Sequence, residues 1–168
     1  INNKNGDINI ISKGIDFSGS IENQAGDVII SSSSGYNQTG TITNNNGLIK
    51  ILNKQNGIAN INGNITNNLG NIVIETGGLD INSNIKAIDG SVSISNAVWK
   101  FTISDTSTIE AKTGISIYNG QNTNKLIVNS DILNTGSGEI NITNECASGI
   151  ELLKGITNKG GNIVISTV

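Results

Sequence analysis

Three aromatic residues and four polar residues near them in the sequence form the set best suited to bind a ligand. An aromatic ring face packs against an apolar patch of a sugar or a protein, and amide groups hydrogen-bond to hydroxyl groups. We therefore predict a ligand-binding surface made of Tyr36, Trp99, Lys100, Tyr118, Asn119, Gln121 and Asn122. The alternative is that the rings only cover the edge of the core, since single surface aromatics are common.

The residue types on which most enzymes rely are missing or scattered. The chain has no histidine and no arginine, and its 13 carboxylates are spread along the sequence without metal-ligand spacing. Asp7 and Asp27 would stack about 5 Å apart on neighbouring repeats, either as a weak cation site or as a solvated pair in a turn. We predict that the protein is not an enzyme and has no catalytic residue, no metal and no cofactor.

Three Asn-x-Ser/Thr sequons, at Asn37, Asn64 and Asn141, are candidate glycosylation sites, although such triplets also arise by chance in a chain rich in asparagine and threonine. The single cysteine, Cys146, has no partner for an intrachain disulfide or a metal site. We interpret Cys146 as a small, partly buried packing residue, and a functional thiol is the alternative.

A glycine-led repeat positions all of these residues. The pattern Gly-x-β-x-β begins at Gly6, Gly26, Gly47, Gly70, Gly90, Gly138 and Gly161, and the copy TGISI at Thr113 lies one residue out of phase. A period of 20 to 24 residues is typical of a solenoid, in which each repeat buries its apolar face by stacking on its neighbours.

Apolar residues at alternate positions indicate which side chains point inward in each coil. The first strand contributes a pair such as Ile8 and Ile10, the second a pair such as Leu79 and Ile81, and the third one isoleucine such as Ile21. We predict an all-β fold over residues 1–168, a single segment cut from a longer repeat array. The fold is a right-handed parallel β-helix of about seven to eight coils of 20–24 residues, with three short strands per coil.

Asparagines that follow the third-strand isoleucine by two positions predict a structural ladder along the rod, formed by Asn23, Asn44, Asn67, Asn134 and Asn158. Gln38 stands where the pattern requires an apolar residue, and the sequence offers no explanation beyond a local distortion. The segment between the first and second strands varies from five to nine residues, and it carries Trp99 and both tyrosines. Length variation at one corner of a solenoid marks the side where loops often bind partners.

Charge and hydropathy exclude two kinds of partner. The net charge is −3 and arginine is absent, so we predict no nucleic-acid partner and no attraction to an anionic membrane. A transmembrane helix needs about 20 consecutive apolar residues, and the sequence has no run of this kind. We therefore predict no direct membrane insertion.

The phrases GNITNNLGNIVI, NNKNGDINI, GEINITNE and ITNKGGNIVI resemble the repeat regions of two-partner-secretion exoproteins, of the filamentous haemagglutinin and high-molecular-weight non-pilus adhesin type. The resemblance runs the full length of the chain. It implies a β-helical fibre on a Gram-negative surface that adheres to host-cell glycans or glycoproteins. It also implies an outer-membrane two-partner secretion transporter for export, and hexoses on Asn37, Asn64 and Asn141. The alternatives are a passive stalk or autotransporter passenger without its own ligand and, third, a polysaccharide lyase or hydrolase.

Overall fold

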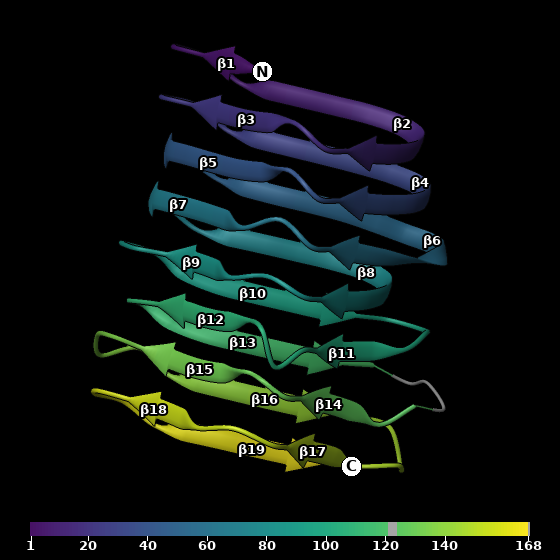
Figure 1. Ribbon diagram of the computed structural model, residues 1–168. Coiled ribbons are helices and arrows are strands. Elements are labelled where there is room, and N and C mark those ends of the chain that lie inside the picture. The colour runs from purple at the N-terminus through teal and green to yellow at the C-terminus, as the bar shows by residue number, and fades with distance from the viewer. Residues whose placement is uncertain (121–123, 168) are drawn as a thin grey trace.

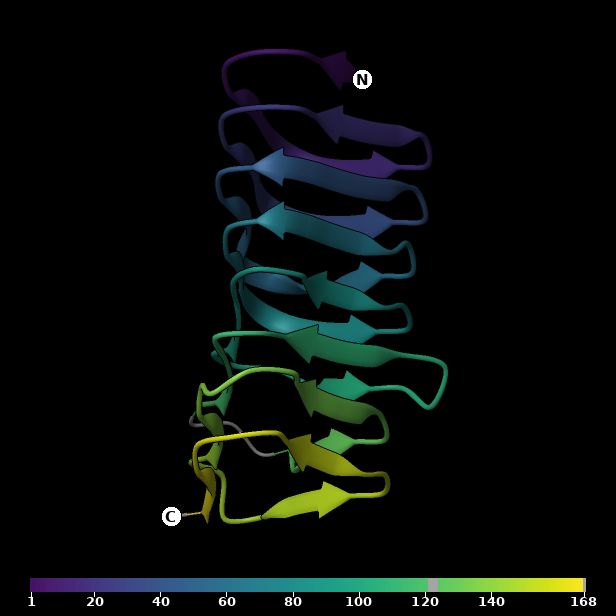
Figure 2. The ribbon, with the colours of Figure 1, turned by 90° about the vertical axis from the view of Figure 1, so that its left-hand side faces the viewer.

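The computed structural model describes residues 1–120 and 124–167, with the backbone but not the side chains of residues 54–56. This part of the chain contains no helix and forms a β-solenoid of about seven turns, in which parallel strands stack about 23 residues apart. Figure 1 shows the turns piled from the N-terminus at the top to the C-terminus at the bottom, and Figure 2 shows the same stack from its side. The prediction of an all-β solenoid is confirmed.

One sheet contains the short third strand of every coil. Its order is β1-β3-β5-β7-β9-β12-β15-β18, and every described pairing in it is parallel. The strands are β1 (Asn2–Asn3), β3 (Ser20–Asn23), β5 (Thr41–Asn46), β7 (Ile65–Leu69), β9 (Ile85–Ala87), β12 (Thr108–Ala111), β15 (Asp131–Asn134) and β18 (Ile156–Asn158).

The other sheet contains the first and second strands of the coils. In the N-terminal half each coil contributes one long strand that bends around a corner: β2 (Ile8–Phe17), β4 (Val28–Gln38), β6 (Ile49–Ile61) and β8 (Ile72–Ile81). In the C-terminal half the corner separates two strands, which are β10 (Ser91–Asn96) and β11 (Phe101–Ile103), β13 (Gly114–Asn119) and β14 (Leu126–Val128), and β16 (Ile140–Asn144) and β17 (Ile150–Leu152). The last strand is β19 (Ile163–Thr167).

The prediction of three short strands in every coil is therefore correct only for the C-terminal half. In β2, β4 and β6 the ladder continues through the corner with a shift of register, between Ser12 and Gly14 in the first of these strands. Such a bulge bends a strand without ending it, so two predicted strands merge into one. In the C-terminal half, corner residues 97–100 and 145–149 leave the ladder and form loops.

Rows of β-branched side chains fill the interior. One row runs in register down the solenoid to Ile163, which is exposed in the last strand. Its other members are buried: Ile8, Val28, Ile49, Ile72, Val92, Ile115 and Ile140. Strand neighbours lie about 4.8 Å apart, so each side chain packs against the same type above and below it. The restricted χ1 of isoleucine and valine suits this regular stacking.

Two physical constraints explain why glycine recurs at this turn, and Gly47 illustrates both. Its φ is +118°, a conformation that disfavours any residue with a Cβ. A Cβ at Gly47 would also lie 2.3 Å from the carbonyl oxygen of Gly26 on the preceding coil. At the copy that is out of phase, Ser91 pairs with Gly114, whose φ is +143°. At Gly47 the turn therefore requires glycine because of backbone conformation and because the coils approach closely.

The predicted asparagine ladder is present between the third strand and the next turn. Asn23, Asn44 and Asn67 are buried and lie in register. The Nδ2 group of Asn67 donates to the carbonyl oxygens of Gly47 and Asn71, both at 2.8 Å. Ala87 and Ala111 interrupt the ladder in the next two coils, and it resumes where Asn134 Nδ2 donates to Asn158 Oδ1 at 2.7 Å. The side-chain amides thus satisfy turn carbonyls that the strand ladder leaves unpaired.

Candidate binding site

An exposed hollow lies at the variable corner of the solenoid, on the outer side of β6 and β8. We call it the Trp99 slot and define it by Gly57, Ile58, Gly78, Trp99, Lys100 and Asn124; all but Gly78 line a hollow of about 310 Å³. Gly57 and Ile58 belong to β6, Gly78 belongs to β8, and Trp99 and Lys100 lie in the loop before β11. This loop projects at the right-hand edge of Figure 1.

Gly78 makes the slot possible because it separates two large apolar side chains. It pairs with Ile58 on the preceding coil. A Cβ at Gly78 would lie 2.8 Å from Cβ of Trp99 and 3.2 Å from Cγ1 of Ile58. Both side chains are accessible, with 46% of Trp99 and 38% of Ile58 exposed. Gly78 itself is buried, so the indole and the aliphatic side chain lie directly over it and leave no room for a methyl group.

The backbone of Trp99 is held on both sides by hydrogen bonds. Its N–H donates to the Gly77 carbonyl oxygen at 2.6 Å, and Nδ2 of the buried Asn96 donates to its carbonyl oxygen at 2.7 Å. The N–H of Val98 also donates to the Gly77 carbonyl oxygen, at 3.0 Å. A site whose backbone is fixed before a ligand arrives loses less conformational entropy on binding.

The charge of Lys100 is paired within the protein. Its Nζ lies 3.0 Å from Oδ1 and 3.1 Å from Oδ2 of Asp80, which belongs to β8. Lys125 on the next coil is paired in the same way, 2.6 Å from Oε2 of Glu151. The described charges next to the slot therefore occur as opposite pairs that link neighbouring coils.

The prediction that Tyr36 lies on the binding surface is wrong. Its side chain is only 2% exposed, and its backbone pairs with Ile15 and Ala59, which are both inward positions. Its hydroxyl donates to Oε1 of Gln38 at 2.8 Å. Burial raises the pKa of Tyr36. Tyr36 and Gln38 together occupy the inward pair of their coil, which explains the polar residue that the sequence pattern left unexplained.

Asn119 is also a core residue and not a surface contact. It is fully buried in a second asparagine ladder, where Asn96 Nδ2 donates to Asn119 Oδ1 at 2.9 Å and Asn119 Nδ2 donates to Asn144 Oδ1 at 2.6 Å. The sequence carries the signal for this ladder, because Asn53, Asn96, Asn119 and Asn144 each follow the second inward isoleucine of the first strand by two positions. This ladder holds the corner loops from inside.

Tyr118 is not among the residues that line the slot. It is half-buried on β13, where it pairs with Ser95 and Thr143 on the neighbouring coils. A hydrogen bond with Glu145 is the main cause that raises its pKa. Two further predicted residues, Gln121 and Asn122, lie outside the described residues. Of the predicted set, the structure places Trp99 and Lys100 together.

Sequence reasoning missed Gly57, Ile58, Gly78 and Asn124 as slot residues. A signal for Gly78 exists in the corner lengths. Only five positions separate Ile74 from Leu79, and the corners of the coils on either side are longer. The corner at Gly77 and Gly78 is short and has no side chains. Ile58 and Trp99, from the longer corners of the two neighbouring coils, therefore lie over it.

The three sequons occupy different environments. Asn64 is exposed, and its Oδ1 accepts a hydrogen bond from the Asn84 N–H at 3.0 Å. Asn37 is half-buried and donates to Asp16 Oδ1 at 3.0 Å, and Asn141 accepts from Thr143 Oγ1 at 3.1 Å. Glycosylation at these positions stays a prediction.

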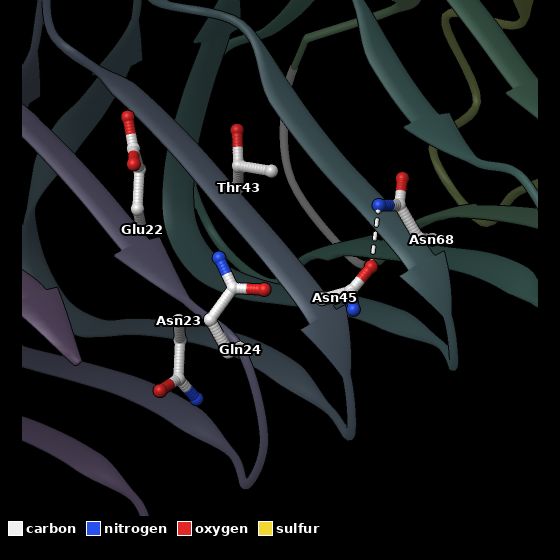
Figure 3. Close-up of a pocket in the computed structure, with 6 residues that line it drawn as sticks. All are labelled: Glu22, Asn23, Gln24, Thr43, Asn45 and Asn68. Carbon is white, nitrogen blue, oxygen red and sulfur yellow. Dashed lines mark hydrogen bonds between the residues drawn. The ribbon is translucent and has the colours of Figure 1, made fainter. Parts of the chain in front are cut away.

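A second hollow, of about 230 Å³, lies on the outer side of β3, β5 and β7. Figure 3 shows the side chains that line it: Glu22, Asn23, Gln24, Thr43, Asn45 and Asn68. Asn68 Nδ2 donates to Asn45 Oδ1 at 2.8 Å, and Asn23 Nδ2 donates to the Gly26 carbonyl oxygen at 3.0 Å. These amides bond along the rod and to the turn, so we interpret this hollow as part of the turn structure.

The stacked pair Asp7 and Asp27 caps the turns. Oδ1 of Asp7 accepts from the Asp27 N–H, and Oδ1 of Asp27 accepts from the Leu48 N–H, both at 2.8 Å. Across residues 1–120 and 124–167, no group of three or more His, Cys, Asp or Glu side chains is placed to hold a metal ion. The same ranges contain no helix long and apolar enough to cross a membrane.

The fold and the site define a β-solenoid protein with an exposed aromatic slot at one corner of its coils. No family model matches the chain, and neither a curated protein nor a solved structure matches it.

Proposed function

We propose that the chain is a segment of a secreted adhesin fibre on a Gram-negative surface, exported by a two-partner secretion transporter, which attaches to host cells through glycans or glycoproteins. The observation that carries this proposal is the Trp99 slot. It presents an indole with 46% of its surface exposed on a backbone fixed by hydrogen bonds. The fold holds this tryptophan exposed to solvent, beside an aliphatic side chain and amides. Such a surface suits contact with a sugar ring or a protein.

The solenoid suits attachment because it is stiff and presents one corner repeatedly along its length. Its ion pairs link neighbouring coils, as in Lys50 with Glu75 at 3.2 Å and Lys86 with Glu110 at 3.1 Å. A binding slot on such a rod is displayed at a fixed orientation and distance. We propose binding in preference to catalysis, because the slot residues that are described supply a ring, an aliphatic group, an amide and a neutralised ion pair.

The test measures attachment of the fluorescently labelled segment to cultured epithelial cells. We expect saturable binding that Trp99→Ala reduces by about tenfold or more, the effect of removing a central aromatic contact. Tyr118→Ala is the matched control, because this ring lies outside the slot, and it should bind as the parent does. Treating the cells with a mixture of glycosidases should lower binding of the parent.

A parent segment that does not bind would favour the passive stalk, in which the solenoid only spaces other parts of a fibre. Equal loss in Trp99→Ala and Tyr118→Ala would place the contact elsewhere on the corner. Turnover of an acidic polysaccharide by the segment would favour the lyase or hydrolase.

A further inference from the structure

We propose that the Trp99 slot selects neutral sugars over sialylated or sulfated ones. This inference rests on the proposed function, glycan binding at the slot, and specifies the class of glycan. It depends on three features of the slot: its apolar walls, its internally neutralised charge, and its extent along the rod.

The walls of the slot match the apolar face of an uncharged pyranose ring. Trp99 and Ile58 stand on either side of Gly78, and both are more than a third exposed. The C–H face of a sugar ring can lie against an indole, while its hydroxyl groups point toward amides and backbone carbonyls at the rim. Asn124 supplies an amide to the lining at the C-terminal end of the slot.

The charges beside the slot do not favour an anion. Both oxygens of Asp80 lie within 3.1 Å of Lys100 Nζ, so this ammonium already has a carboxylate partner. An acidic sugar would have to break that pair, and its own charge would then face Asp80. Placing two like charges side by side disfavours a ligand strongly. Lys125, the next described cation along the rod, is held by Glu151.

The slot is longer than one sugar ring. Its lining residues come from β6 at Gly57, from the loop before β11, and from the segment before β14 at Asn124. From the coil of β6, past those of β8 and β11, to the coil of β14 is three steps. At about 4.8 Å each, these steps give a length of roughly 14 Å along the rod. A short oligosaccharide lying parallel to the rod axis would therefore contact both Ile58 and Asn124.

The experiment uses the fluorescence of Trp99, which is the single tryptophan of the chain. The segment is titrated with neutral oligosaccharides, namely lactose, cellobiose, maltose and diacetylchitobiose, and with sialylated and sulfated lactose. We expect a saturable change with at least one neutral sugar. For lactose and its two acidic forms, we expect the neutral sugar to bind about tenfold more tightly, the scale of one unfavourable charge contact.

Two variants test the structural reasons. Gly78→Ala places a methyl group against Trp99 Cβ and should abolish the response, whereas Gly35→Ala meets nothing within 4 Å and should respond as the parent does. Asp80→Asn keeps the shape of the side chain and releases Lys100. It should therefore raise the affinity for sialyllactose relative to lactose by about tenfold. Circular dichroism of each variant checks that the solenoid is folded.

The possible results separate the inference from the function on which it rests. Acidic sugars that bind as well as neutral ones, or better, would overturn the neutral selectivity and leave glycan binding intact. A fluorescence response that Gly78→Ala leaves unchanged would overturn the assignment to the slot. Failure of every sugar to bind would overturn both this inference and the proposed glycan contact.

Discussion

The hydroxyl of Tyr36 donates a 2.8 Å hydrogen bond to Oε1 of Gln38, two residues along the same strand, and both side chains are buried. Gln38 in turn donates through Nε2 to the carbonyl oxygens of Gly40 at 2.9 Å and Gly63 at 3.1 Å. A phenol and an amide thus form a connected polar network inside an otherwise aliphatic coil. Buried networks of this kind are stable only when their members are satisfied.

The first prediction follows from this network. Tyr36→Phe keeps the ring and removes the donor to Gln38, so a buried amide oxygen loses its partner. We expect the free energy of unfolding to fall by about 1–3 kcal/mol, measured by urea titration followed by circular dichroism. Tyr118→Phe is the control: it also removes a hydrogen bond, with Glu145, but at the surface, where water can replace the lost partner, so we expect a change within about 0.5 kcal/mol. Equal stability of Tyr36→Phe and the parent would show that the bond contributes nothing.

A second prediction concerns alkaline pH. Burial raises the pKa of Tyr36 in the folded protein above the ordinary value of 10.0, because the core disfavours the phenolate. The unfolded chain releases this proton at lower pH than the folded chain does. Stability from Tyr36 is therefore fully present below pH 10 and falls as pH rises from there through the folded pKa, by up to about 1.4 kcal/mol per pH unit.

Urea titrations between pH 8 and 11.5 of the parent and Tyr36→Phe test this effect, because the two proteins differ only in the hydroxyl of Tyr36. We expect the stability of the parent to fall more steeply above pH 10. Parallel curves for the two proteins would contradict a raised pKa at Tyr36.

The repeat in the sequence was enough to predict the solenoid, because buried positions recur at fixed spacing and each makes the same contact as its predecessor. Tyr36 and Asn119 were misplaced for a physical reason. Both are polar or amphipathic residues at inward positions. The asparagine that recurs two positions after an inward isoleucine signals the partner of Asn119, whereas nothing in the repeat pattern pairs Tyr36 with Gln38. The sequence predicted part of the slot, because it singled out Trp99 and Lys100. It did not predict that Ile58 and Trp99, from two other coils, come together over the buried Gly78.

A third prediction separates a structural role from a binding role at Asn119. Asn119→Ala removes the acceptor of Asn96 Nδ2 and the donor to Asn144 Oδ1, so two buried groups lose a partner. We expect a loss of about 2–4 kcal/mol in the free energy of unfolding, since each unsatisfied group costs about 1–3 kcal/mol. Asn46→Ala, at an exposed position, is the matched control. A variant as stable as the control would show that the ladder does not support the fold.

Because Asn96 also holds the carbonyl of Trp99, breaking the ladder at Asn119 should loosen the corner loop. We expect the emission of Trp99 in Asn119→Ala to shift toward longer wavelength, and its quenching by acrylamide to increase. The Asn46→Ala control should leave both signals at the values of the parent.

A fourth prediction concerns the glycine that leads each coil, where two costs of a side chain can be separated. Gly47 has φ +118°, and a Cβ there would lie 2.3 Å from the backbone oxygen of Gly26. Gly149 has φ +79°, with nothing within 4 Å of its Cβ position. Alanine at Gly149 meets only the backbone strain of a left-handed conformation, about 1–2 kcal/mol. Alanine at Gly47 meets that strain and an overlap with the preceding coil, for a total of about 2–5 kcal/mol.

Urea titration of Gly47→Ala and Gly149→Ala measures the difference between these two costs. If Gly47→Ala were no less stable than Gly149→Ala, the close approach between coils would not be what requires glycine, and the turn conformation alone would explain the repeat. The larger loss at Gly47 would instead show that neighbouring coils constrain each other at this turn. Glycine then recurs because stacking, as well as local geometry, excludes a side chain.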